Sequence, residues 1–125
     1  MAVQLKRIGI YVKDMKKSLE FYRMLGLDIP QSADEEQHVE VDHHGLRLAV
    51  ATVEAAKAVF GGWEKPSGNR LELTFQCSSR EAVDELYRKL MEHGYVGLSE
   101  PFDGFWGERY AIVEDPDGNL ISLAD

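Results

Sequence analysis

The order strand, helix, strands occurs twice along the chain, and this doubling most constrains the fold. In the first half, β-branched residues alternate with other residues over residues 7–13, which predicts a half-buried strand. Asp14 follows as the predicted N-cap of a helix that is expected to end at Gly26. Residues 37–50 alternate again on both sides of a turn at 43–45, which is typical of a β-hairpin.

The second half repeats this order with its own capping signals. Residues 70–76 alternate like the first strand, and Ser78 is the predicted N-cap of a helix that ends at Gly94. Glu81 stands three residues after Ser78, as in a capping box. The remaining elements are predicted as strands around 95–99, 109–113 and 120–124, an aromatic-rich loop at 101–107 and a turn at 115–119.

The doubled pattern predicts an α+β fold of tandem βαβββ modules that form a curled mixed sheet around a cavity. Module one is expected over about 1–52 and module two over about 70–125. An alanine-rich helical turn and a connection are expected between them, over about 53–69. At this length the chain is expected to form one domain, residues 1–125.

The sheet faces that the helices leave uncovered carry polar and aromatic residues. Arg7 and Tyr11 lie on this face in the first half, and Arg70 and Glu72 lie on it in the second. These are unusual choices for a face that meets only water, so they indicate two sheets that curl around a shared cavity.

Charge, apolar runs and cysteine content limit the partners and the cellular location that are expected. Fourteen Lys and Arg residues against twenty-two Asp and Glu residues give a net charge of −8, which disfavours binding to nucleic acid or to an anionic membrane surface. No apolar run approaches the ~20 residues of a membrane-spanning helix, and the opening residues do not resemble a signal peptide. The single cysteine, Cys77, permits no internal disulfide, so a cytoplasmic protein is expected.

Two stretches carry a family resemblance: residues 7–27, RIGIYVKDMKKSLEFYRMLGL, and residues 109–121, RYAIVEDPDGNLI. They resemble the opening strand and helix, and the closing hairpin, of the vicinal oxygen chelate superfamily, which includes glyoxalase I, extradiol dioxygenases and bleomycin-resistance proteins. The Asp-Pro-Asp-Gly-Asn run at 115–119 is the most specific marker. The resemblance implies the fold along the whole chain and, as in small members of the family, a homodimer. It does not fix an activity, because this fold hosts unrelated functions.

The resemblance also implies where a metal ion would be bound. Metal-using members place a His or Gln at the opening strand of each half and a carboxylate on the last strand of each half. Here Arg7 and Arg70 occupy the first two places, and Ser122 and either Arg47 or Ala49 occupy the others. Arginine has no lone pair to donate, so neither a metal ion nor another cofactor is expected.

Two classes of function stay open. The first is a metal-free protein that binds and sequesters a small apolar or aromatic compound, as the resemblance to the bleomycin-resistance branch implies. The alternative is a lyase or dioxygenase of the same superfamily. It would use substituted metal ligands such as His38 and Glu40, or a carboxylate base such as Glu72 or Glu108. No catalytic residue is assigned.

Arginines and aromatic residues are the candidate contacts to a small-molecule ligand. Arg7 and Arg70 are expected to lie close together, each within hydrogen-bond reach of a carboxylate, with Glu72 and Glu40 as the expected partners. Either this internal pairing or an anionic ligand explains the two arginines. The acidic net charge favours cationic ligands instead. Rings in the loop at 101–107 are expected to border the cavity mouth, with a minor core or a dimer interface as the alternative. The candidate ligand-binding residues are Arg7, Tyr11, Arg47, Arg70, Glu72, Phe105, Trp106, Tyr110 and Ser122.

Overall fold

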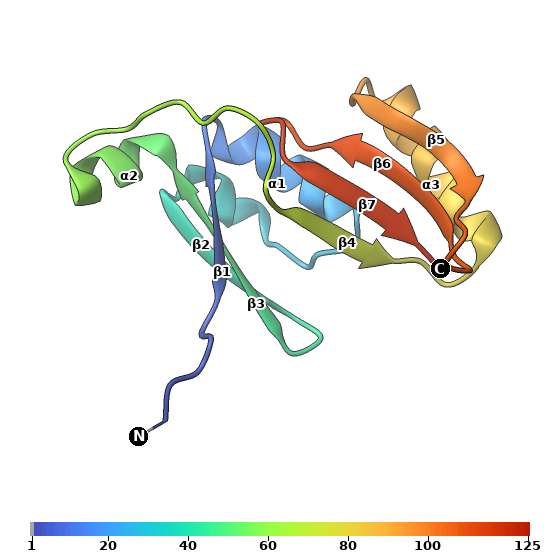
Figure 1. The fold of residues 1–125 in the computed structure, drawn as a ribbon. Helices are drawn as coiled ribbons and strands as arrows, with labels where there is room; N and C mark the ends of the chain where they lie inside the picture. The colour runs from blue at the N-terminus through green and yellow to red at the C-terminus, as the bar shows by residue number, and fades with distance from the viewer. Residues whose placement is uncertain (1) are drawn as a thin grey trace. The chain divides into compact units, whose positions relative to one another are not determined.

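The computed structural model describes residues 2–125, and the chain divides into two units, Met1–Pro66 and Ser67–Asp125. Within the described residues there are seven strands in two mixed sheets, together with three α-helices (Figure 1). In each unit the first strand is followed by a helix, and the chain then returns to the sheet. The predicted α+β class with its doubled module is therefore confirmed.

The sheet of the first unit has three strands in the order β1-β3-β2. The outer strand β1 (Ile8–Val12) runs parallel to the central strand β3 (Leu46–Thr52), and β2 (His38–His43) pairs with β3 in the antiparallel direction. A short 3-10 helix, η1 (Gln31–Glu35), stands where the second unit has a strand after its helix. The first sheet therefore has one strand fewer than the second.

Helix α1 (Met15–Met24) begins and ends where the sequence predicts. The Asp14 carboxylate accepts a hydrogen bond from the backbone N–H of Lys17 at 3.1 Å, which satisfies an N-terminal donor of the helix. Gly26 then adopts a φ of +100°, which glycine reaches without steric cost. The helix contributes its apolar stripe to the core of this unit, where the fully buried residues include Val12, Leu19, Phe21, Tyr22 and Val50.

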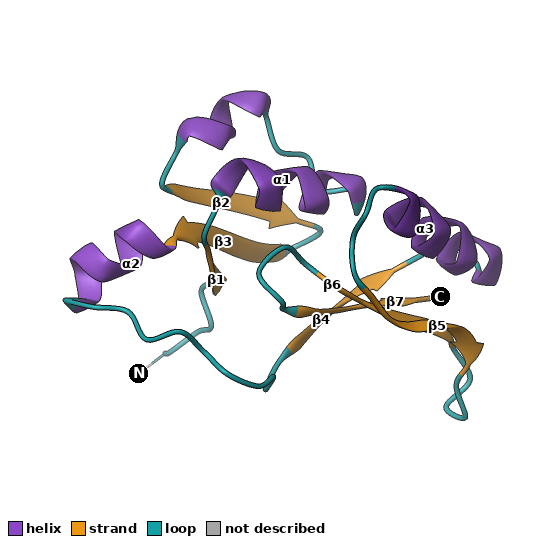
Figure 2. Cartoon of the chain, turned by 90° about the horizontal axis from the view of Figure 1, so that it is seen from above, coloured by secondary structure: helices purple, strands orange, loops and turns teal. Residues whose placement is uncertain are grey.

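Helix α2 (Val53–Phe60) follows directly from β3 and belongs to the first unit (Figure 2). Its N-cap is Thr52, whose hydroxyl accepts a hydrogen bond from the backbone N–H of Ala55 at 3.1 Å. The helix ends at Gly61, which has a φ of +78°. The expected connection over 53–69 thus contains a regular helix that packs against β1 and β3.

The sheet of the second unit has four strands in the order β4-β7-β6-β5. Strand β4 (Glu72–Gln76) runs parallel to β7 (Leu120–Ala124), while β6 (Arg109–Glu114) and β5 (Gly97–Asp103) continue the sheet in antiparallel pairs. Helix α3 (Arg80–Glu92) contacts β5, β6 and β7. Within the described residues no helix combines the length and the apolar character needed to cross a membrane.

The N-cap of α3 is Ser79, so the prediction of Ser78 was wrong by one residue. The Ser79 hydroxyl accepts a hydrogen bond from the backbone N–H of Ala82 at 3.1 Å. With the cap at this place, Glu81 lies only two residues after it, one short of the spacing that a capping box needs. Two adjacent serines are equivalent capping signals in sequence, and the strand that precedes them decides which one is used.

Ser79→Ala is expected to lower the free energy of unfolding by about 1 kcal/mol, because one donor of α3 loses its acceptor. Ser78→Ala is the matched control and should change stability by less than about 0.5 kcal/mol. Urea unfolding followed by circular dichroism measures both. A larger loss in Ser78→Ala than in Ser79→Ala would contradict this capping assignment.

Two strand boundaries also differ from the sequence prediction. Strand β5 runs on to Asp103 instead of ending near residue 99, which shortens the expected loop at 101–107 to residues 104–108. Proline is disfavoured in a central strand, but Pro101 lies on the outer strand of the sheet, within the register shift between Ser99 and Phe102, where it is tolerated. Leu71, which lies within the alternating run at 70–76, precedes β4 and is 78% exposed.

The turn between β6 and β7 is built around a buried carboxylate. Asp115 is only 4% exposed and accepts hydrogen bonds from the backbone N–H groups of Asp117 and Asn119, both at 2.9 Å. It also accepts one from the Asn119 side-chain amide at 2.8 Å. Gly118 supplies a φ of +89°. The predicted turn is therefore confirmed, and these contacts explain why its sequence is so specific.

Candidate functional site

A hollow lies on the uncovered face of the first sheet because three small residues meet there. Gly9 of β1 pairs with Ala49 of β3, and Tyr11 pairs with Ala51. A Cβ atom placed on Gly9 would meet no atom within 4 Å. The centre of this face therefore carries no large side chain, while the Tyr11 side chain projects beside it.

Helix α2 and aromatic rings enclose the hollow, which has a volume of about 210 Å³. Ala55, Val59 and Phe60 of α2 line it on the helix side. The Tyr11 ring packs edge to face on Phe60, with centroids 5.9 Å apart, and on Trp63, with centroids 5.2 Å apart. Most of the lining is apolar, so the hollow suits an uncharged or aromatic body.

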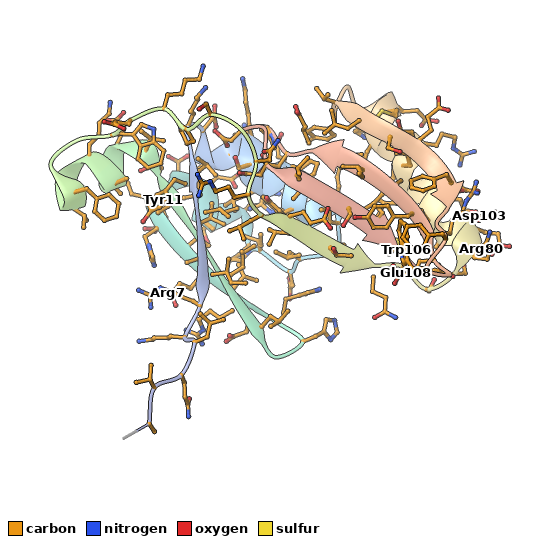
Figure 3. All side chains as sticks on the ribbon, in the orientation of Figure 1. Arg7, Tyr11, Arg80, Asp103, Trp106 and Glu108 are labelled. Carbon is orange, nitrogen blue, oxygen red and sulfur yellow. The ribbon has the colours of Figure 1, made fainter. Side chains whose placement is uncertain are left out.

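Charged side chains form a network on the same sheet face. The Arg47 guanidinium donates to both oxygens of Asp42, at 3.0 and 2.8 Å, and to Glu40 at 3.0 Å. The His38 Nε2 atom lies 2.8 Å from the other oxygen of Glu40. Arg7 also lines the hollow, and its Nε atom is 3.9 Å from Glu40. Arg7 is therefore the most loosely held cation of this network (Figure 3).

These contacts keep Glu40 ionised. The hydrogen bond with His38, followed by that from Arg47, lowers the pKa of the Glu40 carboxyl from 4.5 to about 2. The same pairing, with Glu40 first and Asp42 second, raises the pKa of Arg47. Because the folded pKa of Glu40 is depressed, its contribution to stability is present above pH 4.5 and is lost as the pH falls towards about 2.

The second unit holds a different group of side chains, which we call the aromatic–acidic cluster: Glu72, Phe102, Phe105, Trp106, Glu108 and Tyr110. Trp106 packs edge to face on Tyr110, with centroids 5.0 Å apart, and on Phe105, with centroids 5.1 Å apart. Phe102 contacts both Trp106 and Tyr110, at 6.1 and 6.0 Å. The pairing of Phe102 with Tyr110 across β5 and β6 places the rings together.

Each carboxylate of this cluster accepts a hydrogen bond from an aromatic side chain. The Trp106 indole N–H donates to Glu108 at 2.6 Å (Figure 3). The Tyr110 hydroxyl lies 2.9 and 3.0 Å from the two oxygens of Glu72. Burial, ahead of these carboxylates, raises the pKa of the Tyr110 phenol, so the phenol keeps the proton that it donates.

The structure thus separates the candidate residues into the two units. Arg7, Tyr11 and Arg47 share the uncovered face of the first sheet, whereas the other candidates belong to the second unit. Ser122 is fully buried, with its hydroxyl oxygen 2.7 Å from that of Thr74. The predicted place of the aromatic rings at a cavity mouth stays a prediction.

The expected pairing of Arg70 with a carboxylate is not found within the second unit. Among the described residues of that unit, no carboxylate lies within 4.0 Å of the Arg70 guanidinium. Glu72, one of the two expected partners, accepts a hydrogen bond from Tyr110 instead, and a pairing of Arg70 with Glu40 stays a prediction. Arg7 forms an ion pair with Glu40, but their separation of 3.9 Å is longer than the expected hydrogen bond. The predicted proximity of Arg7 and Arg70 stays a prediction.

The model of the Glyoxalase/Bleomycin resistance protein/Dioxygenase superfamily matches residues 4–123. The chain belongs to this superfamily. This confirms the resemblance drawn from residues 7–27 and 109–121.

Similar proteins extend over the same length as this superfamily member. The uncharacterized protein YraH of Bacillus subtilis (strain 168) is 31% identical over 124 residues, which cover 97% of each chain. The hypothetical protein SA1046 from S. aureus has a TM-score of 0.82 at 22% identity, covering 99% of this chain and 94% of that one. A glyoxalase/bleomycin resistance protein/dioxygenase family enzyme from Burkholderia phytofirmans PsJN has a TM-score of 0.82 at 20% identity, covering 94% of each. At these identities the two structures show the fold alone.

The positions of the helix caps change which residue of the second half corresponds to a metal-ligand position of the superfamily. Arg7 lies seven residues before the N-cap Asp14. The residue seven before the N-cap Ser79 is Glu72, not Arg70. Glu72 is therefore the second-half counterpart of Arg7, and the sequence-based assignment was two residues early.

Strand pairing settles the position on the last strand of each half. Ser122 pairs with Thr74, which lies two residues after Glu72. In the first half the matching partner of Gly9, two residues after Arg7, is Ala49. Of the two alternatives left open by the sequence, Ala49 is thus the counterpart of Ser122, and Arg47 is not.

The residues at these four positions do not fit the superfamily's metal ion. They are Arg7, Ala49, Glu72 and Ser122, and only Glu72 carries a strong ligand for a divalent ion. Both Glu72 oxygens are within hydrogen-bonding distance of the Tyr110 hydroxyl. In the part of the chain that the structure describes, no group of three or more His, Cys, Asp or Glu side chains is placed to hold a metal ion.

Two further candidates for chemistry have ordinary surroundings. His38 and Glu40, considered as substituted metal ligands, are hydrogen-bonded to each other, and Arg47 holds the second Glu40 oxygen. Cys77 is half-buried, and this burial raises the pKa of its thiol. A thiol with a raised pKa carries little thiolate at neutral pH, so Cys77 is a weak nucleophile.

The contribution of α2 to the hollow was not predicted from the sequence. Ala55, Val59 and Phe60 line it, although residues 52–62 were expected to be only a helical turn and a connection. A sequence signal was present, because the threonine cap and the apolar run follow directly after an alternating strand. Such a helix has to pack against the sheet that it leaves.

Proposed function

We propose that this superfamily member is a metal-free binding protein that sequesters a small aromatic molecule with an anionic group. The hollow on the first sheet carries the proposal, because it joins an apolar enclosure to a loosely paired guanidinium. The proposed role is the one that the resemblance to the bleomycin-resistance proteins of the superfamily implies. A cytoplasmic location and a homodimer belong to the proposal, but binding does not require them.

The size and lining of the hollow determine the body of the ligand. Its volume of about 210 Å³ is below the roughly 300–1,000 Å³ of pockets for drug-sized ligands, so it suits one or two fused rings. Tyr11 and Phe60 offer ring surfaces, and Ala49 and Ala51 offer a flat floor. Burial of apolar area against these side chains supplies the driving force.

Arg7 determines the charge of the ligand. The Arg7 Nε atom lies 3.9 Å from a Glu40 oxygen, which is longer than the roughly 2.7–2.9 Å of a charge-assisted hydrogen bond. The N–H groups of Arg7 are therefore available to a ligand. The Arg7 side chain is 40% exposed and lines the hollow. Arg47, in contrast, is committed to Asp42 and Glu40. A ligand carboxylate would meet Arg7 without displacing a strong ion pair.

Calorimetric titration with 2-naphthoate and with its uncharged amide, 2-naphthamide, tests this proposal. The carboxylate is expected to bind at one site per chain and about three- to tenfold more tightly than the amide. Arg7→Gln should abolish the difference, whereas Arg88→Gln, a matched loss of charge on α3, should preserve it. Equal affinity of the two probes for the unchanged protein, or no saturable binding, would refute the proposal.

A further inference from the structure

The aromatic–acidic cluster of the second unit is not explained by a site for anionic ligands. Its rings are unusually accessible: Phe105 is 99% exposed and Trp106 is 45% exposed. Large exposed rings that are grouped together mark a site of interaction more often than scattered apolar residues do. Edge-to-face packing groups the rings without parallel stacking, and Trp106 keeps 45% of its surface exposed although Gly104 lies against its ring.

The two carboxylates increase the negative character of the ring faces. The Trp106 indole N–H donates to Glu108, and the Tyr110 hydroxyl donates to Glu72. Donation to an anionic acceptor shifts electron density onto the donor's ring, since the N–H or O–H bond becomes more polarised. Both rings therefore attract a cation more strongly than isolated Trp or Tyr side chains do.

The local charge balance is also negative. Among the described residues of the second unit, no Lys, Arg or His nitrogen lies within 4.0 Å of the Glu72 or Glu108 carboxylate. Arg109, at the start of β6, is held by Asp84 at 2.9 Å and by Asp103 at 3.3 Å. Arg80 pairs with Asp103 as well (Figure 3). Arg80 and Arg109 are thus compensated, whereas Arg70, two residues before Glu72, is not paired within this unit. Two carboxylates against this one cation keep the local charge negative.

We propose that the aromatic–acidic cluster binds small organic cations, with an alkylated ammonium group placed against the faces of Trp106 and Tyr110. An alkylated ammonium ion is weakly hydrated, so aromatic faces replace its water at low cost. The nearby Glu72 and Glu108 provide the balancing negative charge. This site belongs to the second unit, and its proposal does not rest on the function proposed for the hollow of the first unit.

The test compares choline with 3,3-dimethylbutan-1-ol, its uncharged isostere in which carbon replaces the ammonium nitrogen. Trp63→Phe removes the other tryptophan, so fluorescence in this background reports on Trp106. Choline is expected to change the fluorescence saturably, and the alcohol should bind at least about threefold more weakly. Equal binding of the alcohol would show an apolar patch only and would overturn the proposal.

Variants that remove charge but keep a hydrogen-bond acceptor locate the site. Glu72→Gln and Glu108→Gln should each weaken choline binding by about threefold or more. Glu85→Gln, the same change at an exposed position of α3, should leave it unaltered. Equal affinity in all three variants would overturn the proposal.

Sedimentation velocity separates ligand binding from self-association. The proposal expects Phe105→Ser to leave the sedimentation coefficient unchanged, because the cluster faces a ligand and not a second copy of the chain. A shift from dimer to monomer in this variant, together with no choline response in the unchanged protein, would assign the rings to a subunit interface and overturn the proposal.

Discussion

Asp115→Ala is expected to lower the free energy of unfolding by about 2–4 kcal/mol. The buried carboxylate accepts two backbone hydrogen bonds, from Asp117 and Asn119, and one from the Asn119 side chain. Alanine leaves these three donors without their acceptor in a part-buried turn. The turn joins β6 to β7, so its loss weakens the pairing of the two central strands of the second sheet. Urea unfolding followed by circular dichroism measures the change.

Asp28→Ala provides the matched control for this prediction. Asp28 is exposed and lies between structural elements, so its substitution should change stability by less than about 0.5 kcal/mol. Equal losses in the two variants would mean that the buried carboxylate does not organise the turn. Asp115→Asn, which keeps a side-chain oxygen, should fall between Asp115→Ala and the unchanged protein.

Ala55→Leu is expected to weaken binding of 2-naphthoate by at least about tenfold, because it fills part of the hollow. Ala55 lies on α2 with its side chain against the cavity of about 210 Å³. Leucine has almost the helix propensity of alanine, so the helix itself should persist. Calorimetric titration measures the affinity, and circular dichroism checks the fold.

Ala58→Leu makes the same chemical change on the exposed side of the same helix. It should leave the affinity for 2-naphthoate within about twofold of the unchanged protein. If both variants bind as tightly as the unchanged protein, the ligand does not occupy the hollow. If both lose binding equally, α2 acts through its general packing and not through its contact with the ligand.

Local signals allowed most of the fold to be predicted. The alternation over residues 7–13 and the cap at Asp14 each depend on neighbours within a few residues, so they can be recognised without knowledge of the tertiary structure. The same holds for the hairpin turn at 43–45 and for the turn at 115–119. Here the chain's local preferences agree with its packing.

The register of the second half was less accessible to sequence reasoning. Side chains in a strand alternate with a period of two, so a slip of two residues keeps every side chain on the same face. Alternation alone therefore could not distinguish Arg70 from Glu72 as the counterpart of Arg7. The distance from each residue to the helix cap decides it, and this required the correct cap, Ser79.

The hollow depends on contacts between segments that are distant in sequence. Gly9 and Ala49 are each ordinary small residues, and only their pairing across β1 and β3 creates an open floor. The wall comes from α2, and the sequence alone does not predict which face of the sheet this helix packs against. Arg7 and Tyr11 could be predicted as residues of the uncovered face, but the enclosure around them could not.

Calorimetric titration of chelator-treated protein with 2-naphthoate tests the metal-free binding function most directly. The four positions Arg7, Ala49, Glu72 and Ser122 do not suit a divalent ion, so binding should not depend on one. We expect one equivalent of 2-naphthoate per chain, with the same dissociation constant before and after treatment with EDTA. Binding that disappears with the chelator and returns on addition of zinc, nickel, manganese or iron would contradict this account.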